Sequence, residues 1–371
     1  MPIYMDRHDV SEEVTAEHVA QLHHEDLKIE QKFNCRGLTY WFDGDRKTAF
    51  CLVEAPNKEA IQKMHDQAHG ALPNKIIEVD ENLVESFLGR IEDPKSNITD
   101  NGLNIINESA FRVLMVIKKS SYLSRLEANQ FSLFSQKFHN SVVKSIKHFK
   151  GNIVKRDNYN YLVSFKSVSN AVYCALKIQS NFKYITPKFD IPNRKINIAL
   201  STGDPVSHTE VIFEEAIVLA SRMCEIVKGQ LIISSEVKTL YNSENRNAVI
   251  DTELIKVLNI SDEKFLTKLM ESIKKTWSNP NFKVGLLCKQ LGYSKSQLYR
   301  KLKSLTGKSP NNFIREFKLN KAIKLLYNQQ GNISEIAYET GFNSPAYFSK
   351  CFMNKYGILP SKYSKQNIAN S

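Results

Sequence analysis

The chain has 371 residues, 42% of them hydrophobic, with 51 Lys and Arg against 39 Asp and Glu and a formal net charge of +12. This length predicts two or three domains, and the hydrophobic content can fill a core in each. No stretch approaches the roughly 18 consecutive apolar residues of a membrane span, the N-terminus lacks a secretory segment, and the six cysteines show no pairing pattern. We therefore expect a cytoplasmic protein with no membrane partner.

The charge is divided unevenly along the chain. Residues 1–95 contain 11 basic and 19 acidic residues, a net −8, whereas residues 264–371 contain 19 basic and 4 acidic residues, a net +15. Concentrated positive charge binds nucleic-acid phosphates by releasing counterions. A lysine-rich face that contacts only solvent would give the same counts, so charge alone leaves both interpretations open.

The first 90 residues predict a small α+β domain. Apolar strand segments alternate with amphipathic helix segments in the order βαββαβ, and an Asp-Gly turn joins the two central strands. This is the ferredoxin-like order. The strands are expected at 3–8, 38–41, 48–53 and 75–79, and the helices at 15–33 and 58–68.

A short motif in this domain resembles a family of small nickel-responsive ferredoxin-like proteins. It runs from Phe50 to Pro56 and continues with His65 and His69. These two histidines are four residues apart on one helix, so both imidazoles project the same way, and His8 ends a strand that could reach them. Imidazole suits Ni²⁺ and similar divalent transition metals. We predict His8, His65 and His69 as ligands of such an ion.

Other interpretations of the histidines stay open. His65 and His69 could lie in solvent near a helix C-terminus, where the helix dipole favours a charged imidazole. We expect His18, His23 and His24 to be surface residues. The polar segment 92–104 predicts a linker, and a second boundary is expected between 243 and 262.

Residues 105–242 predict a second α+β domain with the sheet on one side. Strands are expected at 111–117, 161–165, 196–200 and 230–234, and helices at 130–149, 167–182 and 214–227. Several stretches resemble the catalytic domain of the class III nucleotide cyclases, namely 113–117 with 120–121, 151–155, 162–165, 175–179, 201–205, 219–222 and 229–234.

The catalytic positions of that family are mostly lost in this chain. The resemblance places the two metal-binding aspartates at Val116 and Tyr159 and the ribose-orienting asparagine at Val218, and it retains only the phosphate-facing Arg222. Mg²⁺ requires oxygen ligands, and Asp157 could restore only one of the two carboxylates. We expect no bound Mg-nucleotide and no enzyme activity. Because cyclase domains of this type pair with twofold symmetry, the resemblance implies a homodimer or a ligand-sensing module.

The C-terminal region contains the same pattern twice, about fifty residues apart. The first copy runs from Val284 to Phe313 and the second from Ile333 to Tyr363. Each has a small residue in its first helix, Cys288 or Ala337, which lets a second helix cross closely. Each then has a glycine, Gly292 or Gly341, which suits the left-handed backbone of a turn. The pattern predicts two helix-turn-helix motifs.

The second helix of each motif has its own start signal and a polar face. Ser294 and Gln297 form a capping box, and Ser344 precedes Pro345 at the first helical position. A connecting helix from Pro310 would hold both helices at a fixed separation, so that they enter successive major-groove segments. The residues predicted to contact DNA are Ser294, Ser296, Tyr299, Arg300 and Lys303 in the first motif and Ser344, Ala346, Tyr347, Ser349 and Lys350 in the second.

Residues 264–366 resemble the DNA-binding domain of the AraC/XylS transcriptional regulators. The resemblance rests on both turn motifs, on the connecting stretch 315–322 and on the closing stretch 357–363. It implies binding to double-stranded DNA and regulation of transcription, with RNA polymerase as a further partner. A helical bundle with chance glycines is the alternative.

The expected fold class is multidomain α+β plus all-α, in which ferredoxin-like and cyclase-like domains precede a double helix-turn-helix domain. Two other functions remain open: an active nucleotide cyclase attached to a DNA-binding tail, and a protein whose main task is metal binding. Formation of a cyclic nucleotide would identify the first. Metal affinity of the N-terminal region without DNA binding would identify the second.

Overall fold

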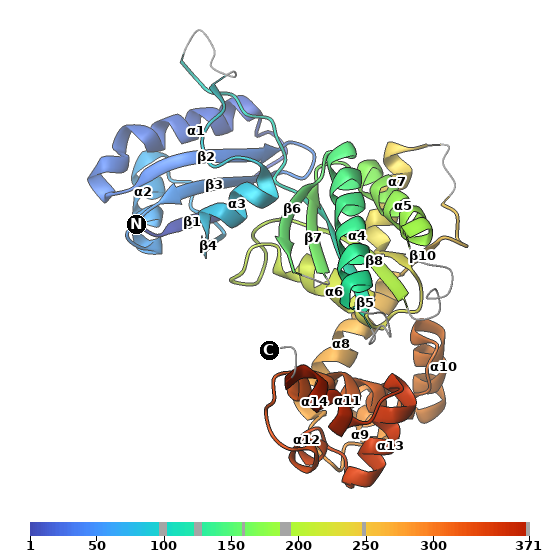
Figure 1. The fold of residues 1–371 in the computed structure, drawn as a ribbon. Helices are drawn as coiled ribbons and strands as arrows, with labels where there is room; N and C mark the ends of the chain where they lie inside the picture. Colours follow the sequence, from blue (N-terminus) through green and yellow to red (C-terminus); the bar gives the residue numbers. More distant parts are fainter. Residues whose placement is uncertain (96–101, 122–127, 158–159, 186–193, 247–249, 369–371) are drawn as a thin grey trace.

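The computed structural model describes residues 1–95, 102–121, 128–157, 160–185, 194–246 and 250–368. They form a four-stranded sheet, a six-stranded sheet and a C-terminal helical region, which confirms the predicted fold class (Figure 1). Tyr159 lies outside the described residues. No described helix is both long enough and apolar enough to cross a membrane.

The N-terminal module has the predicted ferredoxin-like order, with all strand pairs antiparallel and the sheet order β2-β3-β1-β4. Thr15 and Asn57 cap the two main helices by accepting backbone N–H groups. A third helix, which the sequence pattern did not predict, follows the last strand. The elements are β1 (Ile3–Asp9), α1 (Ala16–Ile29), the 3₁₀ helix η1 (Glu30–Phe33), β2 (Arg36–Asp43), β3 (Thr48–Glu54), α2 (Lys58–Ala68), β4 (Lys75–Val79) and α3 (Glu81–Leu88).

The middle module is built on the larger sheet, in the order β10-β9-β8-β5-β7-β6. All the strands and helices predicted here are present, and β6, α7 and β10 are additional. The elements are β5 (Arg112–Ser121), α4 (Ala128–His148), β6 (Asn152–Arg156), β7 (Asn160–Phe165), α5 (Val168–Ile185), β8 (Arg194–Gly203), α6 (Glu214–Ile226), β9 (Leu231–Ile233), α7 (Ser235–Glu244) and β10 (Ile255–Val257).

The prediction of a sheet covered on one side is wrong. Val113, Met115 and Ile117 of β5 pack with α4, α5 and α7, while Val116 packs on the opposite face with α6 and the following helix α8 (Ile260–Thr276). Successive side chains of a strand point to opposite faces, and here both sets are apolar. The segment 243–262, which was predicted to be a domain boundary, contains β10. This strand pairs with β9 and forms an edge of the sheet.

The C-terminal module contains the two predicted helix-turn-helix motifs. α9 and α10 form the first, α12 and α13 form the second, and α11 connects them. The elements after α8 are α9 (Val284–Leu291), α10 (Lys295–Thr306), α11 (Pro310–Tyr327), α12 (Ile333–Glu339), α13 (Pro345–Tyr356) and α14 (Pro360–Ile368).

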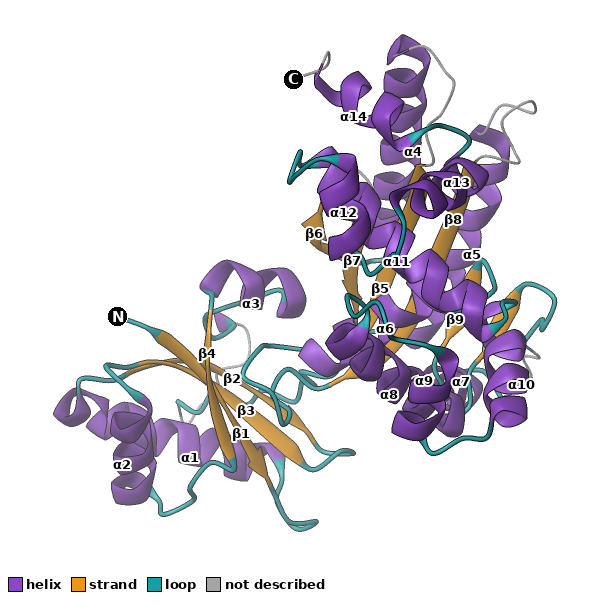
Figure 2. Cartoon of the chain, turned by 90° about the horizontal axis from the view of Figure 1, so that it is seen from below, coloured by secondary structure: helices purple, strands orange, loops and turns teal. Residues whose placement is uncertain are grey.

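Neighbouring modules share hydrophobic cores. In the N-terminal module α1 and α2 lie on one side of the sheet and α3 on the other (Figure 2). The α3 side, with Trp41 and Phe50, also packs against Leu114 and Phe213 of the middle module. Part of the predicted linker is anchored as well: the Tyr40 hydroxyl donates to the carbonyl of Asn104 at 2.7 Å. The modules therefore contact one another through buried side chains.

Candidate DNA-reading helices and N-terminal histidine cluster

Both predicted turns have the expected backbone. Gly292 has φ 72° and Gly341 has φ 75°, the left-handed region that favours glycine. A Cβ on Gly341 would also lie 2.9 Å from the carbonyl oxygen of Ser278, so a side chain would not fit there. Cys288 and Ala337 are buried where the two helices of each motif cross. The local sequence signals therefore fix both turns.

The first reading helix, α10, exposes most of the residues predicted to contact DNA. Ser294 and Gln297 form the predicted capping box, which starts the helix. Tyr299 is 48% exposed, and Arg300 is exposed with no hydrogen-bond or ion-pair partner among the described residues. Ser296 and Lys303 are exposed too, although Lys303 donates to the carbonyl of Gly307 at 3.1 Å.

The second reading helix, α13, presents a similar face. Ser344 caps the helix by accepting the N–H of Tyr347, and Pro345 occupies the first turn as predicted. Ala346, Tyr347 and Lys350 are exposed, while Ser344 and Ser349 are half-buried. The opposite edge is fully buried through Phe348 and Phe352. α13 is thus amphipathic, and its polar side faces solvent.

The connector α11 belongs to two hydrophobic cores. Phe313 and Ile314 pack with the first motif, and Leu319, Ala322 and Leu326 pack with the second. This anchoring at both ends fixes the reading helices relative to each other. Leu319, Ala322 and Leu326 are spaced at i, i+3 and i+7, which places them on one face of the helix.

The sequence pattern missed Lys318, a buried lysine of α11. Only 6% of this residue is exposed, and its Nζ donates to the carbonyl of Gly341 at 2.7 Å. Burial lowers the pKa of Lys318 from its usual 10.5. The contact joins the connector to the second turn. On a lysine-rich helix no sequence signal separates this residue from solvent-facing lysines.

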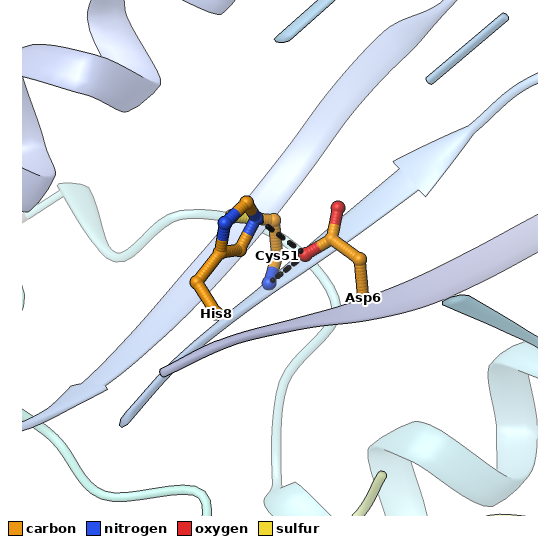
Figure 3. A group of neighbouring side chains, drawn as sticks. All are labelled: Asp6, His8 and Cys51. Atoms are coloured by element: carbon orange, nitrogen blue, oxygen red, sulfur yellow. Dashed lines mark hydrogen bonds and ion pairs between the residues drawn. The ribbon is translucent and has the colours of Figure 1, made fainter. Parts of the chain in front are cut away.

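The predicted histidine ligands lie together in the N-terminal module, within two adjoining groups of donor atoms. One group contains Asp26, His65 and His69, and the other contains Asp6, His8 and Cys51 (Figure 3). Within each group the donor atoms lie within 4.8 Å of one another. The rings of His8 and His65 are 5.2 Å apart, so the groups are continuous.

His65 is held between two carboxylates. Its Nε2 lies 3.0 Å from Asp6 and its Nδ1 lies 3.0 Å from Asp26. Burial disfavours the charged ring, but the hydrogen bonds to Asp26 and Asp6 prevail and raise the pKa of His65 from 6.5 to about 10. Burial would raise the pKa of Asp6, but the charge of His8 and the hydrogen bond with His65 outweigh this effect. The pKa of Asp6 therefore falls well below its usual 3.8.

Two expectations about the histidines are corrected. His65 is only 1% exposed, so the alternative of two solvent-facing histidines does not hold for it. His23 is 6% exposed rather than a surface residue, because it lies 3.4 Å from Asp93 and packs on the ring of Tyr40. His18 is exposed and His24 is half-buried.

The acidic and sulfur partners in the cluster were missed. Asp6 lies on the same face of β1 as His8, two residues away, which is a period that the sequence could have revealed. Asp26 and Cys51 come from α1 and β3, and only the fold brings Asp26 close to His65 and Cys51 close to His8. Nitrogen, oxygen and sulfur donors of this kind fit a borderline divalent metal ion.

The comparisons with known proteins agree with this geometry. Residues 287–366 match a family model described as Helix-turn-helix domain, and residues 4–79 match one described as Nickel responsive protein SCO4226-like. The activator RhaS of Mannheimia succiniciproducens is 44% identical over 63 residues, which are 17% of this chain and 24% of that protein. The C-terminal module is an AraC-type helix-turn-helix domain.

The chain is also similar to a histidine kinase and to two solved structures. Histidine kinase P4 of Formosa agariphila is 40% identical over 105 residues, which are 28% of this chain and 8% of the kinase. The solved structure of SCO4226 from Streptomyces coelicolor is 34% identical, with a TM-score of 0.20, and covers 21% of this chain and 94% of that one. The solved structure of a bacterial light-regulated adenylyl cyclase is 12% identical, with a TM-score of 0.29, and covers 64% of this chain and 86% of that one. The chain thus spans less than a quarter of the length of each of the two sequence relatives, RhaS and the kinase.

The AraC-type domain is attached to the middle module at the end of its first reading helix. The backbone N–H of Lys228 donates to the carbonyl of Leu305 at 2.7 Å, and the Nζ of Lys256 donates to the carbonyl of Ser304 at 3.1 Å. Both carbonyls lie in the last turn of α10, where carbonyl groups lack intrahelical partners. The middle module therefore caps α10, the second helix of the first helix-turn-helix motif.

Val116, Val218 and Arg222, three positions that the resemblance to cyclases singled out, lie on this same side of the middle module. Val116 is buried under α6 and α8. Val218 and Arg222 line a cleft that α6 forms with α11. Asp157 is exposed and bonds to Asn160.

Proposed function

We propose that this chain is a sequence-specific transcription regulator that binds double-stranded DNA through α10 and α13. The observation that carries the proposal is the pair of exposed polar faces on two helices that one doubly anchored connector holds in place. A net charge of +15 in residues 264–371 supports it, because DNA affinity depends on neutralised phosphates. Helices held in this way can enter successive segments of the major groove.

The residues proposed to contact DNA are those predicted from the sequence, with the exposed Arg300, Tyr299, Tyr347 and Lys350 at the centre of the two faces. Selection of duplexes from a random library by the full-length protein tests the proposal. We expect one enriched sequence with two half-sites about one helical turn apart. Binding to every duplex with equal affinity would refute it.

Arg300→Ala is expected to relax sequence preference at one position. A guanidinium that pairs with a guanine edge contributes roughly 1–3 kcal/mol of discrimination, and Arg300 has no competing partner among the described side chains. Competition binding with single-base variants of the selected site measures the effect. The control is Lys289→Ala on α9, which removes the same charge from an exposed position and should weaken all sequences about equally. If the Arg300→Ala variant kept the same sequence preference, Arg300 would not be one of the residues that contact bases.

We also propose that the N-terminal module binds Ni²⁺ or another divalent transition metal, and so senses it. The converging donors of Asp26, His65 and His69 support this, together with the adjoining Asp6, His8 and Cys51. Ligation through His65 requires that ring to lose a proton, because both of its nitrogens face carboxylates. Metal binding should therefore release protons and weaken as the pH falls.

His69→Ala is expected to reduce Ni²⁺ affinity by at least about tenfold, because it removes one donor from a converging set. The His69 side chain is 4% exposed, and its Nε2 lies 3.2 Å from Asp26. Titration calorimetry of the full chain with Ni²⁺ measures the change. His18→Ala is the control, since His18 is exposed outside both donor groups. Equal affinities in the two variants would exclude His69 as a ligand.

Pairing into a homodimer and contact with RNA polymerase stay predictions. Within one chain, α6, α8 and the first helix-turn-helix motif already cover the Val116 face of the middle sheet. Any twofold pairing therefore has to use another surface. Sedimentation equilibrium of the full chain, with and without operator DNA, tests the dimer.

Cyclase activity is the alternative that the middle module raises. With ATP or GTP and Mn²⁺ we expect no cyclic product, because the valine at position 116 offers no oxygen ligand from its side chain. A cyclic product that disappears in an Arg222→Ala variant would contradict this expectation.

A further inference from the structure

A cleft of about 610 Å³ lies between the middle module and the AraC-type domain. Its walls come from β5 and α6 on one side and from α8 and α11 on the other. The volume lies within the range of small-ligand sites, roughly 300–1,000 Å³. A molecule in this cleft would contact both modules at once.

The lining of the cleft is strongly basic. It contains seven Lys and Arg residues but only two acidic residues, Glu225 and Glu316. Both acids already have partners, since Glu225 pairs with Lys118, and Glu316 pairs with Lys308 at 2.7 Å. The carboxylates of the cleft therefore do not neutralise the remaining cations.

Arg222 is one of the more buried of these cations, although Lys119, at 7% exposed, is buried further. Its side chain is 12% exposed, and its Nε is buried without a hydrogen-bond partner among the described atoms. Among the described carboxylates the guanidinium is within ion-pair distance of Glu271 alone, at 3.7 Å, and the side chain of Glu271 is 55% exposed. A buried N–H without an acceptor is costly, so an acceptor in the cleft would stabilise it.

Three lysines line the other wall of the cleft. Among the described residues, Lys274 of α8 and Lys324 of α11 have no carboxylate within ion-pair distance. Burial lowers the pKa of Lys321, and the positive charges of Lys324 and Lys274 lower it further, although the negative charge of Glu225 raises it. These ammonium groups are close enough to repel, and a shared anion would remove the repulsion.

We propose that this cleft binds a small organic or inorganic anion that carries a diphosphate or two phosphate groups. Arg222 would donate hydrogen bonds to one phosphate, as guanidinium groups do, and Lys274, Lys321 and Lys324 would balance the charge. Because α6 and α11 contribute opposite walls, the bound anion links the middle module to the connector of the DNA-binding domain. The proposal does not depend on DNA binding and is tested without DNA.

Pyrophosphate is the probe, titrated calorimetrically into the full chain. The variant Lys274→Gln with Lys324→Gln removes two cleft charges from exposed positions. The control, Lys268→Gln with Lys275→Gln, removes two charges from exposed positions on α8 that do not line the cleft. We expect saturable binding by the native chain, at least about tenfold weaker binding by the cleft variant, and an unchanged affinity in the control.

A fluorescence measurement locates the bound anion. The chain has two tryptophans, Trp41 in the N-terminal core and Trp277, which lies 5.7 Å from the Nζ of Lys321. Pyrophosphate should change the emission of the native chain but not of Trp277→Phe. Adenosine diphosphate and fructose 1,6-bisphosphate, titrated in parallel, distinguish a nucleoside from a sugar as the carrier of the phosphates.

Two results would overturn the proposal. The first is the absence of saturable pyrophosphate binding. If the cleft variant then weakened only the binding of duplex DNA, the lysines would contact the DNA backbone instead. The second is equal weakening in the cleft variant and the control, which would indicate an effect of overall charge. Circular dichroism of each variant establishes that the comparison is made between folded proteins.

Discussion

Phe348→Ala is expected to unfold the second helix-turn-helix motif locally and to remove one half of the DNA contact. Phe348 is fully buried, and its ring lies 5.2 Å from Phe342 and 5.7 Å from Phe352. Truncation of such a side chain costs about 3–5 kcal/mol, which is comparable to the stability of a whole small domain. Hydrogen exchange of α12 to α14 and DNA affinity measure the two effects.

The loss should be confined to the second motif, because its core is separate from the core that the first motif shares with the middle module. Amides of α9 and α10 should keep their protection. Met353→Ala on the same helix is the control, since Met353 is 42% exposed. If Phe348→Ala exposed both motifs equally, the two cores would form one cooperative unit and this interpretation would be wrong.

Asp6→Asn is expected to destabilise the metal-free N-terminal module by about 3–5 kcal/mol at neutral pH, because it removes one partner from a buried charged network. Asp6 is 1% exposed, bonds to His65, and accepts the backbone N–H of Cys51 at 3.0 Å. Denaturant unfolding in the presence of a chelator measures the change. Asp66→Asn, at an exposed position next to His65, is the matched control and should change little.

The same network predicts a pH dependence. The groups that face His65 are Asp6 and His8 of β1, Asp26 of α1 and His69 at the end of α2. Because the folded pKa of His65 is raised from 6.5 to about 10, its contribution is complete below pH 6.5 and is lost as the pH rises towards 10. The depressed pKa values of Asp6 and Asp26 act oppositely, and their contribution is lost as the pH falls below 3.8.

In Asp6→Asn the alkaline loss should be smaller, because His65 retains only one carboxylate. The chelated native protein should therefore lose more stability than the variant between pH 6.5 and 10. Parallel curves for the two proteins over this range would mean that His65 does not titrate against Asp6.

Some parts of this molecule were predictable because their signals are local. Ser294 with Gln297 starts a helix within one turn, and Gly292 and Gly341 mark backbone conformations that few other residues adopt. The spacing of His65 and His69 predicted a common side, and their rings lie 5.3 Å apart although His69 is the residue that follows α2. The face of α11 from Leu319 to Leu326 follows from the helical period alone.

Other parts needed distant segments to meet. Asp26 lies 39 residues from His65 and Asp6 lies 59 residues from it, so no short pattern places these two carboxylates on either side of the His65 ring, although the spacing of Asp6 and His8 on β1 is local. Lys318 and Lys324 belong to one lysine-rich helix, yet the first is buried against Gly341 and the second is exposed at the cleft. Packing decides between such identical residues, and periodicity does not.

The order of the modules, both helix-turn-helix motifs and the residues on their polar faces follow from local signals in the chain, because caps, turn glycines and apolar periods act over a few residues. How the modules meet depends on the assembled fold: the core that joins Trp41 to Phe213, the capping of α10 by Lys228 and Lys256, and the basic cleft between α6 and α11. These contacts depend on the shape and charge of surfaces assembled from remote segments, which no local pattern specifies.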